Sequence, residues 1–358
     1  MKTKFSGKRI SSIIGIVPEN ESFFDDEVDN YPFPAKQTLK LKKVMGYEKH
    51  RVVKPETAAS DLCIYGLDYL LATGIIRKEE IGAIVVTTTF PDHFIPPVSN
   101  LIQGHYQLPD DVVCLDISQG CVAFVVGLME AFLILDHLET GKKALVFATD
   151  VLSKKVSKQD RNSYPLIGDG AGIAVVENDP DAKDIPFVLH NNGAMGKTLI
   201  IPAGGSRMPS SAETAEMRDF NGDGNLRALD NLTMDGTGVF NFVQSEVPPM
   251  ITGLLDDQNL SIEDIDWFLF HQPNKFMLRK LAEKIGIPYE KMPMNLVENF
   301  GNSSGATIPI CLTYNLAEGM KENVYRCCLS SFGSGLTWGA MIIDLGKLDA
   351  CELLISNC

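Results

Sequence analysis

The feature that most constrains this chain is a nearly uniformly apolar segment from Cys121 to about His137, which is long enough for about four helical turns. A helix that is apolar on every side belongs in the middle of a large core. The segment follows a short apolar run over 112–117, which predicts a buried strand, and residues 118–120 (Ser-Gln-Gly) break that run. Cys121 is therefore expected where a strand ends and a buried helix begins.

This position gives Cys121 two interpretations. Free backbone N–H groups and the positive end of a helix dipole lower a thiol's pKa, which would make Cys121 a nucleophile. Alternatively, Cys121 is a small buried hydrophobe, as many free cysteines are. The position alone does not separate the two interpretations.

Composition and charge narrow the class of protein. The 358 residues suggest two domains or one double domain, and the net charge of −14 argues against nucleic acid and anionic membranes as partners. The eight cysteines have no regular spacing and form no CxxC pair, which excludes the pattern of a disulfide framework and disfavours zinc. The apolar run over 13–17 is too short for a signal peptide or a membrane span, so we expect a cytoplasmic protein.

Strand and helix patterns alternate along the chain, which predicts an α/β architecture with a largely parallel sheet. The expected strands are 10–17, 81–89, 112–117, 144–149 and 173–176, and the expected helices are 57–74, 97–106 and 121–137, with short helices over 20–45. The glycine-rich run 168–172 leads into a strand rather than a helix, so it indicates close packing rather than phosphate binding.

A weak internal repeat divides the chain. Residues 79–86 resemble 263–270 at an offset of roughly 184 residues, which is the size of one domain. The same offset carries Cys121 onto Gly305, which again precedes an apolar helical segment. We therefore expect two halves of one plan, 1–178 and 239–358, joined by an irregular region over 179–238, with loops of both halves meeting at a shared site.

The connecting region contains one metal-like pattern. Residues from Asp219 to Asp230 fit a twelve-residue calcium loop, with Asp in place of the usual final Glu. Runs of Asn, Asp and Gly are also ordinary turn chemistry, and a plain turn is the simpler interpretation.

Three more polar segments stand at the ends of apolar runs in the second half. His271 follows the apolar run 268–270, Asn302 lies in a glycine-rich loop before a helix, and the loop 331–339 is rich in glycine. Each has an ordinary explanation, as a structural histidine or as turn residues. Glycines in the last loop would also let backbone N–H groups approach a reacting oxygen.

Taken together, these segments resemble the ketoacyl synthase branch of the thiolase superfamily, and most closely β-ketoacyl-[acyl-carrier-protein] synthase III. The resemblance covers nearly the whole chain and rests on ISQGCVAF, GDGAG, MDGTGVFNF, FHQPNKFML, NFGNSSGATIP and SSFGSGLTWG, in the family's order. It implies a thiolase-like α/β fold with two pseudo-symmetric halves in five αβαβα layers. It also implies a homodimer that takes acyl-CoA or acyl-carrier thioesters as substrates, with no bound cofactor or metal.

The resemblance implies roles for individual residues. Cys121 would attack the acyl thioester, and the N–H groups of Cys121 and Ser334 would bind the oxyanion. His271 and Asn302 would donate hydrogen bonds to the thioester carbonyl of malonyl-[acyl-carrier-protein] as CO2 leaves. The implied substrate-binding residues are Phe94, Ile95, Arg161, Phe276, Gly301 and Gly333, with Phe94 or Ile95 entering the partner subunit's acyl pocket.

The chain departs from the family at the coenzyme A clamp, an aromatic residue and two arginines. The matching positions here are Lys40, Val44 and Phe276, and only Arg161 keeps the family residue. A carrier-bound donor is therefore an alternative to acyl-CoA. An acidic acyl carrier protein needs a basic landing site, for which Arg279, Lys280 and Lys284 are candidates, although they also fit a solvated helix face.

These observations predict a condensing enzyme of fatty-acid or related biosynthesis. The enzyme would transfer an acyl group to Cys121 and then perform a decarboxylative Claisen condensation. Two alternatives remain at this point. One is an acyltransferase on the same fold that passes the acyl group to an oxygen or nitrogen nucleophile in secondary metabolism. The other is an inactive partner subunit that only binds acyl chains.

Overall fold

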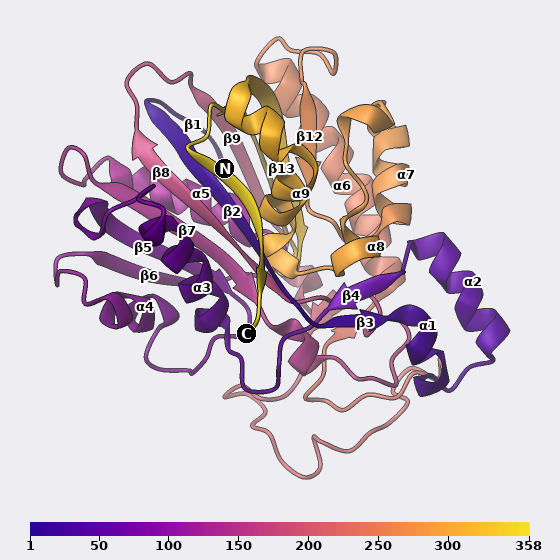
Figure 1. Cartoon of the computed structure of the whole chain (residues 1–358). Coiled ribbons are helices and arrows are strands. Elements are labelled where there is room, and N and C mark those ends of the chain that lie inside the picture. The colour runs from indigo at the N-terminus through magenta and orange to yellow at the C-terminus, as the bar shows by residue number, and fades with distance from the viewer.

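The computed structural model describes residues 1–358 and contains two large mixed β-sheets (Figure 1). The first sheet has six strands, in spatial order β15 (Ala350–Ser356), β2 (Lys8–Pro18), β8 (Gly170–Asn178), β7 (Lys143–Asp150), β5 (Ile81–Thr88) and β6 (Val113–Ser118). The second has five, in order β1 (Lys2–Phe5), β9 (Ile185–Asn191), β14 (Thr337–Gly346), β13 (Val324–Gly333) and β12 (Trp267–Phe270).

Helices form three layers around these sheets. The middle layer, between the two sheets, consists of α5 (Ala123–Leu135) and α9 (Thr307–Glu322), whose apolar side chains share one core with both sheets. The outer layers are α3 (Ala59–Ala72) with α4 (Val98–Tyr106), and α6 (Gly236–Asp257) with α7 (Lys275–Ile285). Figure 1 shows these outer pairs on opposite sides of the molecule. The fold thus has five αβαβα layers, with the apolar helix α5 at its centre as predicted.

The shorter elements gather around the carboxyl ends of the strands. They are β3 (Glu21–Phe23), α1 (Phe24–Glu27), α2 (Ala35–Met45), β4 (Lys49–Arg51), β10 (Leu199–Ile200), β11 (Thr233–Met234) and α8 (Leu296–Phe300), with short 3₁₀ turns between them. Helix α2 packs beside α7, although more than two hundred residues separate the two in sequence (Figure 1).

The two sheets share one topology, which confirms two pseudo-symmetric halves. Four strands of the first sheet run in the order β2–β8–β7–β5, and four of the second in the order β9–β14–β13–β12. In both sets the first two pairings are antiparallel and the third is parallel. Helices α5 and α9 occupy equivalent places before β7 and β13.

The expectation of a largely parallel sheet holds for three of the five pairings in the first sheet, but it is wrong for the second sheet, where one pairing of four is parallel. Strands β13 and β14 are joined by the three residues 334–336, and so short a connection permits only antiparallel pairing. No crossover α-helix lies between β7 and β8, and these strands also pair antiparallel. Parallel pairing occurs only at β5–β6, β5–β7, β12–β13 and β2–β15.

The two ends of the chain cross between the halves. Strand β1 pairs with β9 in the second sheet, whereas the C-terminal strand β15 pairs with β2 in the first. Strand β9 belongs to the second sheet although it lies in the stretch 179–238 expected to connect the halves. Within the same stretch, residues 201–232 contain no helix or strand.

In the structure, the segment from Asp219 to Asp230 forms the hydrogen bonds of a turn. The carboxylate of Asp219 accepts hydrogen bonds from the backbone N–H groups of Asp223 and Gly224 at 3.1 and 2.9 Å. Asp230 instead accepts hydrogen bonds from Ser210 and Thr214. No group of three or more acidic, histidine or cysteine side chains in the chain is arranged to hold a metal ion.

The glycines of the 168–172 run approach other segments closely, because a Cβ on Gly168 would lie 2.1 Å from the carbonyl oxygen of Phe300 and one on Gly172 would lie 2.0 Å from Pro309. The expected close packing is therefore confirmed. None of the helices combines the length and the hydropathy that crossing a bilayer requires.

Candidate active site

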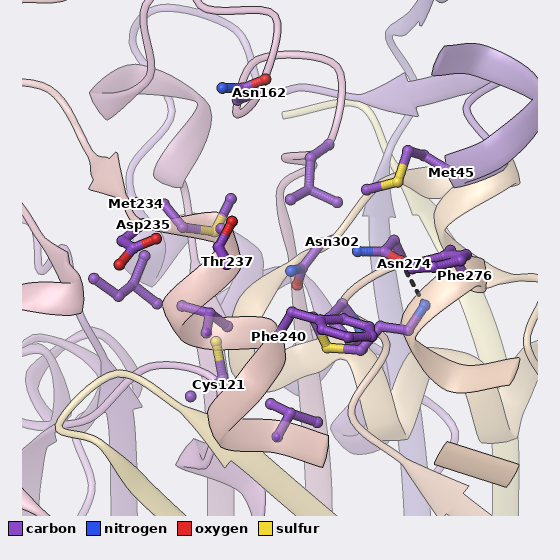
Figure 2. A pocket seen from close by; sticks show the side chains of 18 of the residues that line it. Met45, Cys121, Asn162, Met234, Asp235, Thr237, Phe240, Asn274, Phe276 and Asn302 are labelled. Atoms are coloured by element: carbon purple, nitrogen blue, oxygen red, sulfur yellow. Dashed lines mark hydrogen bonds between the residues drawn. The ribbon is translucent and has the colours of Figure 1, made fainter. Parts of the chain in front are cut away.

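A large cavity has a volume of about 810 Å³ and is lined by residues from both halves of the chain. Its wall includes Cys121, His271 and Asn302, three residues that come from loops far apart in the sequence. Figure 2 shows Cys121 and Asn302 on this cavity, with Phe240 and Phe276 beside them. The structure therefore brings together the three polar residues that the sequence singled out.

Cys121 lies two residues before the first turn of α5, where the backbone turns sharply. The N–H of Ala123 donates to the carbonyl of Gly120 at 2.7 Å, which closes that turn. Gly333, at the end of β13, packs directly on the cysteine, because a Cβ there would lie 2.4 Å from Cys121 Cβ and 2.7 Å from Sγ. Only glycine lets the two halves approach so closely at this point.

The expectation of a lowered pKa for Cys121 is wrong. Burial is the largest effect and, with the nearby Asp150 carboxylate, raises the pKa of the Cys121 thiol to about 11. The backbone N–H groups of Ser334 and Cys121 act in the opposite direction and lower this pKa. Burial outweighs these donors because it removes water from the thiolate.

His271 follows β12 and is almost completely buried. Its Nδ1 lies 2.7 Å from the hydroxyl oxygen of Thr307, and its ring packs edge-to-face on Phe332 with centroids 5.7 Å apart. Burial lowers the pKa of His271 to about 3, so the imidazole is neutral at pH 7. The Thr307 hydroxyl has one proton, which it can donate to His271 Nδ1 or to the carbonyl of Ser304 at 3.0 Å, and the neutral ring carries its proton on Nε2 only in the first case.

Asn302 is oriented by its own loop. Its side-chain oxygen accepts a hydrogen bond from the backbone N–H of Ser304 at 2.9 Å, which leaves the amide NH₂ group as a donor for the cavity. Its backbone is fixed on both sides, since its N–H donates to Leu166 at 2.7 Å and its carbonyl accepts from Gly168 at 3.1 Å.

A second cavity of about 310 Å³ also opens at Cys121 and Asn302. Its wall is mainly apolar, with Ser304 and Ser334 near the sulfur. The apolar residues are Leu152, Leu166, Ile167, Leu199, Ile200, Ile201, Leu232 and Met234. Such a chamber excludes water from one side of the thiol and fits a hydrocarbon chain.

The structure separates the other expected substrate-binding residues. Gly333 and Phe276 line the large cavity. Gly301 does not line this cavity and packs on Gly168 and His50. Arg161 also lies outside the lining, and its guanidinium stacks 3.6 Å from the centre of the Phe33 ring. Phe94 and Ile95 are 87 % and 84 % exposed, in the loop after β5, and contribute to neither cavity that contains Cys121.

Two of the three residues expected to bind the carrier protein, Arg279 and Lys280, lie on one surface. Arg279 and Lys280 of α7 line a groove against α2, together with Lys42, Lys43 and Lys275. This α2–α7 groove meets the mouth of the large cavity at Phe276. Lys284 lies outside the groove, where its ammonium donates to the carbonyl of Gln244. Three glutamates in the groove, Glu48, Glu283 and Glu298, reduce its positive charge.

Sequence reasoning did not single out three residues that the site uses. Thr307 holds the imidazole of His271, and the Ser304 hydroxyl lies beside both Cys121 and Asp150. Asp150 ends β7, is fully buried, and accepts hydrogen bonds from Thr88 and Thr89. A polar residue that ends an apolar strand was the available signal for Asp150, as it was for His271.

Solved structures show the same fold. A 3-oxoacyl-(acyl-carrier protein) synthase from Burkholderia xenovorans superimposes with a TM-score of 0.91 at 27% identity, covering 99% of both chains. A 3-oxoacyl-(acyl-carrier-protein) synthase III superimposes with a TM-score of 0.87 at 30% identity, covering 94% of this chain and 99% of the other. Fold and cavity together define a thiolase-like protein.

Sequence relatives then specify the family. The family model for 3-oxoacyl-[acyl-carrier-protein] synthase III matches residues 115–193, and the model for its C-terminal part matches residues 255–345. The β-ketoacyl-[acyl-carrier-protein] synthase III of Syntrophomonas wolfei is 32% identical over 84% of this chain and 87% of its own length. The corresponding protein of Natranaerobius thermophilus is 33% identical, over 83% and 88%. The chain belongs to the 3-oxoacyl-[acyl-carrier-protein] synthase III family, and it is an acyl-transferring condensing enzyme of fatty-acid biosynthesis.

Proposed function

We propose that Cys121 carries the acyl group and that His271 and Asn302 stabilise the enolate of the second substrate. The observation that supports this assignment is the convergence of these three side chains on one cavity. In the first step Sγ attacks the acyl thioester, the carbonyl oxygen becomes an oxyanion beside the N–H groups of Cys121 and Ser334, and the donor thiol leaves with the cysteine proton.

The second step uses the other two donors. The bond between the malonyl α-carbon and its carboxylate breaks, CO2 leaves, and the electron pair forms an enolate at the thioester oxygen. Hydrogen bonds from His271 Nε2–H and the Asn302 amide would be worth about 3–4 kcal/mol each at that oxygen. The α-carbon then attacks the acyl-Cys121 carbonyl, and the cysteine thiolate is released and reprotonated.

The substrates would be acyl thioesters, and malonyl-[acyl-carrier-protein] would supply the nucleophile. The Arg161–Phe33 stack and the absence of the family clamp at Lys40, Val44 and Phe276 favour a carrier-bound acyl donor over acyl-CoA. The α2–α7 groove, with Arg279 and Lys280 next to the cavity mouth, is the landing site we assign to the acidic carrier.

A homodimer would complete the acyl chamber. Strand β6 is an unpaired sheet edge, and Phe94 and Ile95 extend from the neighbouring loop almost fully exposed. Large apolar side chains in such a position are typical of a protein interface. We assign them to the acyl chamber of the partner subunit.

Intact-protein mass spectrometry tests the assignment of Cys121. The protein is exposed to a panel of acyl-CoA and acyl-carrier thioesters, and a mass gain equal to the acyl group is expected, which disappears in Cys121→Ala. Release of CO2 from malonyl-[acyl-carrier-protein] is measured in parallel. Acylation without CO2 release would instead support transfer to an oxygen or nitrogen nucleophile, and absence of acylation would support a subunit that only binds acyl chains.

A further inference from the structure

A buried histidine–glutamate pair lies next to the Asn302 loop. His50, in the middle of β4, and Glu27, at the end of α1, are 1% and 3% exposed. His50 Nε2 lies 2.6 Å from Glu27 Oε1, and His50 Nδ1 lies 2.5 Å from the carbonyl oxygen of Ile167. Neither residue lines a cavity that contains Cys121.

The partners of the ring define its hydrogen-bonding role. A backbone carbonyl can only accept, so His50 Nδ1 donates to Ile167. The Glu27 carboxylate also accepts hydrogen bonds from the hydroxyls of Ser22 and Tyr31 at 2.5 and 3.1 Å. Burial lowers the pKa of His50, but the hydrogen bond and the charge of Glu27 outweigh burial and raise that pKa, which favours an imidazolium that donates from both nitrogens. These charge-assisted bonds fix the ring between α1 and the segment 166–168.

That segment is the one that holds Asn302. Leu166 and Gly168, on either side of Ile167, make the two backbone hydrogen bonds to Asn302. His50 also contacts the preceding residue, because a Cβ on Gly301 would lie 2.8 Å from His50 Cβ. The pair therefore touches the Asn302 loop at two points, by a hydrogen bond through Ile167 and by packing on Gly301.

We propose that His50, held by Glu27, is a positioning residue that keeps the carboxamide of Asn302 aimed at the enolate oxygen. The inference rests on the role proposed above for Asn302. Loss of the His50 bonds would free the 166–168 segment and displace the carboxamide, and a misplacement of about 1 Å costs up to about a hundredfold in rate. Acyl transfer to Cys121 uses oxyanion donors on other loops, so it should fall less than CO2 release, although Leu166 and Ile167 also line the apolar chamber.

The test compares the two half-reactions in four variants. In His50→Gln, which can donate to only one of the two acceptors at a time, CO2 release from malonyl-[acyl-carrier-protein] is expected to fall about tenfold, while acylation of Cys121 stays within about twofold. In Asn302→Ala, CO2 release falls further, and adding His50→Gln to it has no additional effect, because the two residues act as one unit. His105→Gln, an exposed histidine on α4, is the matched control.

Each outcome has one meaning. Equal loss of both half-reactions in His50→Gln, or an additive loss in the double variant, overturns the positioning role. Unchanged CO2 release in Asn302→Ala contradicts the proposed function instead. If His50→Gln does not fold, Glu27→Gln keeps the volume and removes the charge, and the same split between CO2 release and acylation is required of it.

Discussion

The backbone N–H of Ser304 donates a 2.9 Å hydrogen bond to the side-chain oxygen of Asn302. This bond fixes which end of the carboxamide faces the cavity, since the oxygen is occupied and the NH₂ group is left for a ligand. The orientation of Asn302 is thus set by the residue two positions after it, and it is the donor end that meets the substrate.

Replacement of this donor by an isosteric acceptor gives the first prediction. Asn302→Asp keeps the bond from Ser304 but places a carboxylate where negative charge develops during decarboxylation. We expect CO2 release from malonyl-[acyl-carrier-protein] to fall by about 10²–10³-fold, the cost of one such donor. Acylation of Cys121, followed by intact mass, should change little. Equal effects on both half-reactions would mean that Asn302 does not act on the enolate.

Gly333 provides a steric test. In Gly333→Ala the new Cβ would lie 2.4 Å from Cys121 Cβ, so the β13 loop must move and carry the Ser334 N–H with it. We expect the rate of Cys121 acylation to fall at least about tenfold. Gly193→Ala is the control, because a Cβ at Gly193 meets no atom within 4 Å. An unimpaired Gly333→Ala protein would show that the loop position is not needed.

The pKa of Cys121 predicts the pH dependence of its alkylation. Burial raises this pKa to about 11, so the thiolate fraction grows about tenfold per pH unit throughout the range from 7 to 10. The rate of carboxamidomethylation of Cys121, measured by peptide mass spectrometry, should follow this slope without a plateau. A plateau below pH 9 would show that the N–H groups of Ser334 and Cys121 outweigh burial.

His271 predicts how stability depends on pH. Its folded pKa is lowered to about 3, whereas an unfolded histidine has a pKa near 6.5. Below pH 6.5 the unfolded chain therefore binds a proton that the folded chain excludes, and stability is lost as the pH falls. Between pH 7 and 5 this group should cost about 2 kcal/mol. Urea unfolding of the unaltered protein and of His271→Gln at the two pH values measures this effect. The free energy of unfolding should fall by about 2 kcal/mol less in His271→Gln.

If the α2–α7 groove binds the carrier, a charge change there should weaken the reaction with the carrier-bound substrate without affecting the reaction with malonyl-CoA. Lys280→Glu should raise the KM for malonyl-[acyl-carrier-protein] about three- to tenfold and reduce its dependence on salt, because a charge at the rim acts mainly on encounter. The reaction with malonyl-CoA should stay unchanged. Lys183→Glu is the control, because Lys183 is an exposed lysine that does not line the groove. A similar effect of both substitutions would exclude a specific landing site.

Much of the fold could be predicted because it depends on local pattern. Strand β5 ends one residue from its expected limit, and the helix at 123–135 lies within the apolar segment that first identified it. The repeat also predicted the matching halves. The antiparallel pairings were missed because they depend on connections, such as the three-residue link between β13 and β14, that the alternation of elements does not encode.

The reactive residues of the site could be predicted from the sequence, whereas the residues that orient them could not. Cys121, His271 and Asn302 stand at strand or helix boundaries, which a sequence displays. The partners that orient them are different, since Thr307 lies 36 residues from His271 and His50 lies 117 residues from Ile167. The raised pKa of Cys121 likewise depends on burial by both halves, which local sequence does not reveal.

The crossed termini have a consequence for how this molecule can be divided. Because β1 borders the second sheet and β15 borders the first, each half carries one strand borrowed from the opposite end of the polypeptide. If the chain is cut within 201–232, the two fragments should stay associated through the β2–β15 side of the first sheet. If either half is expressed alone, it lacks the strand from the other end of the chain and exposes unpaired backbone groups at a sheet edge. The two ends of the chain therefore tie the two halves to each other.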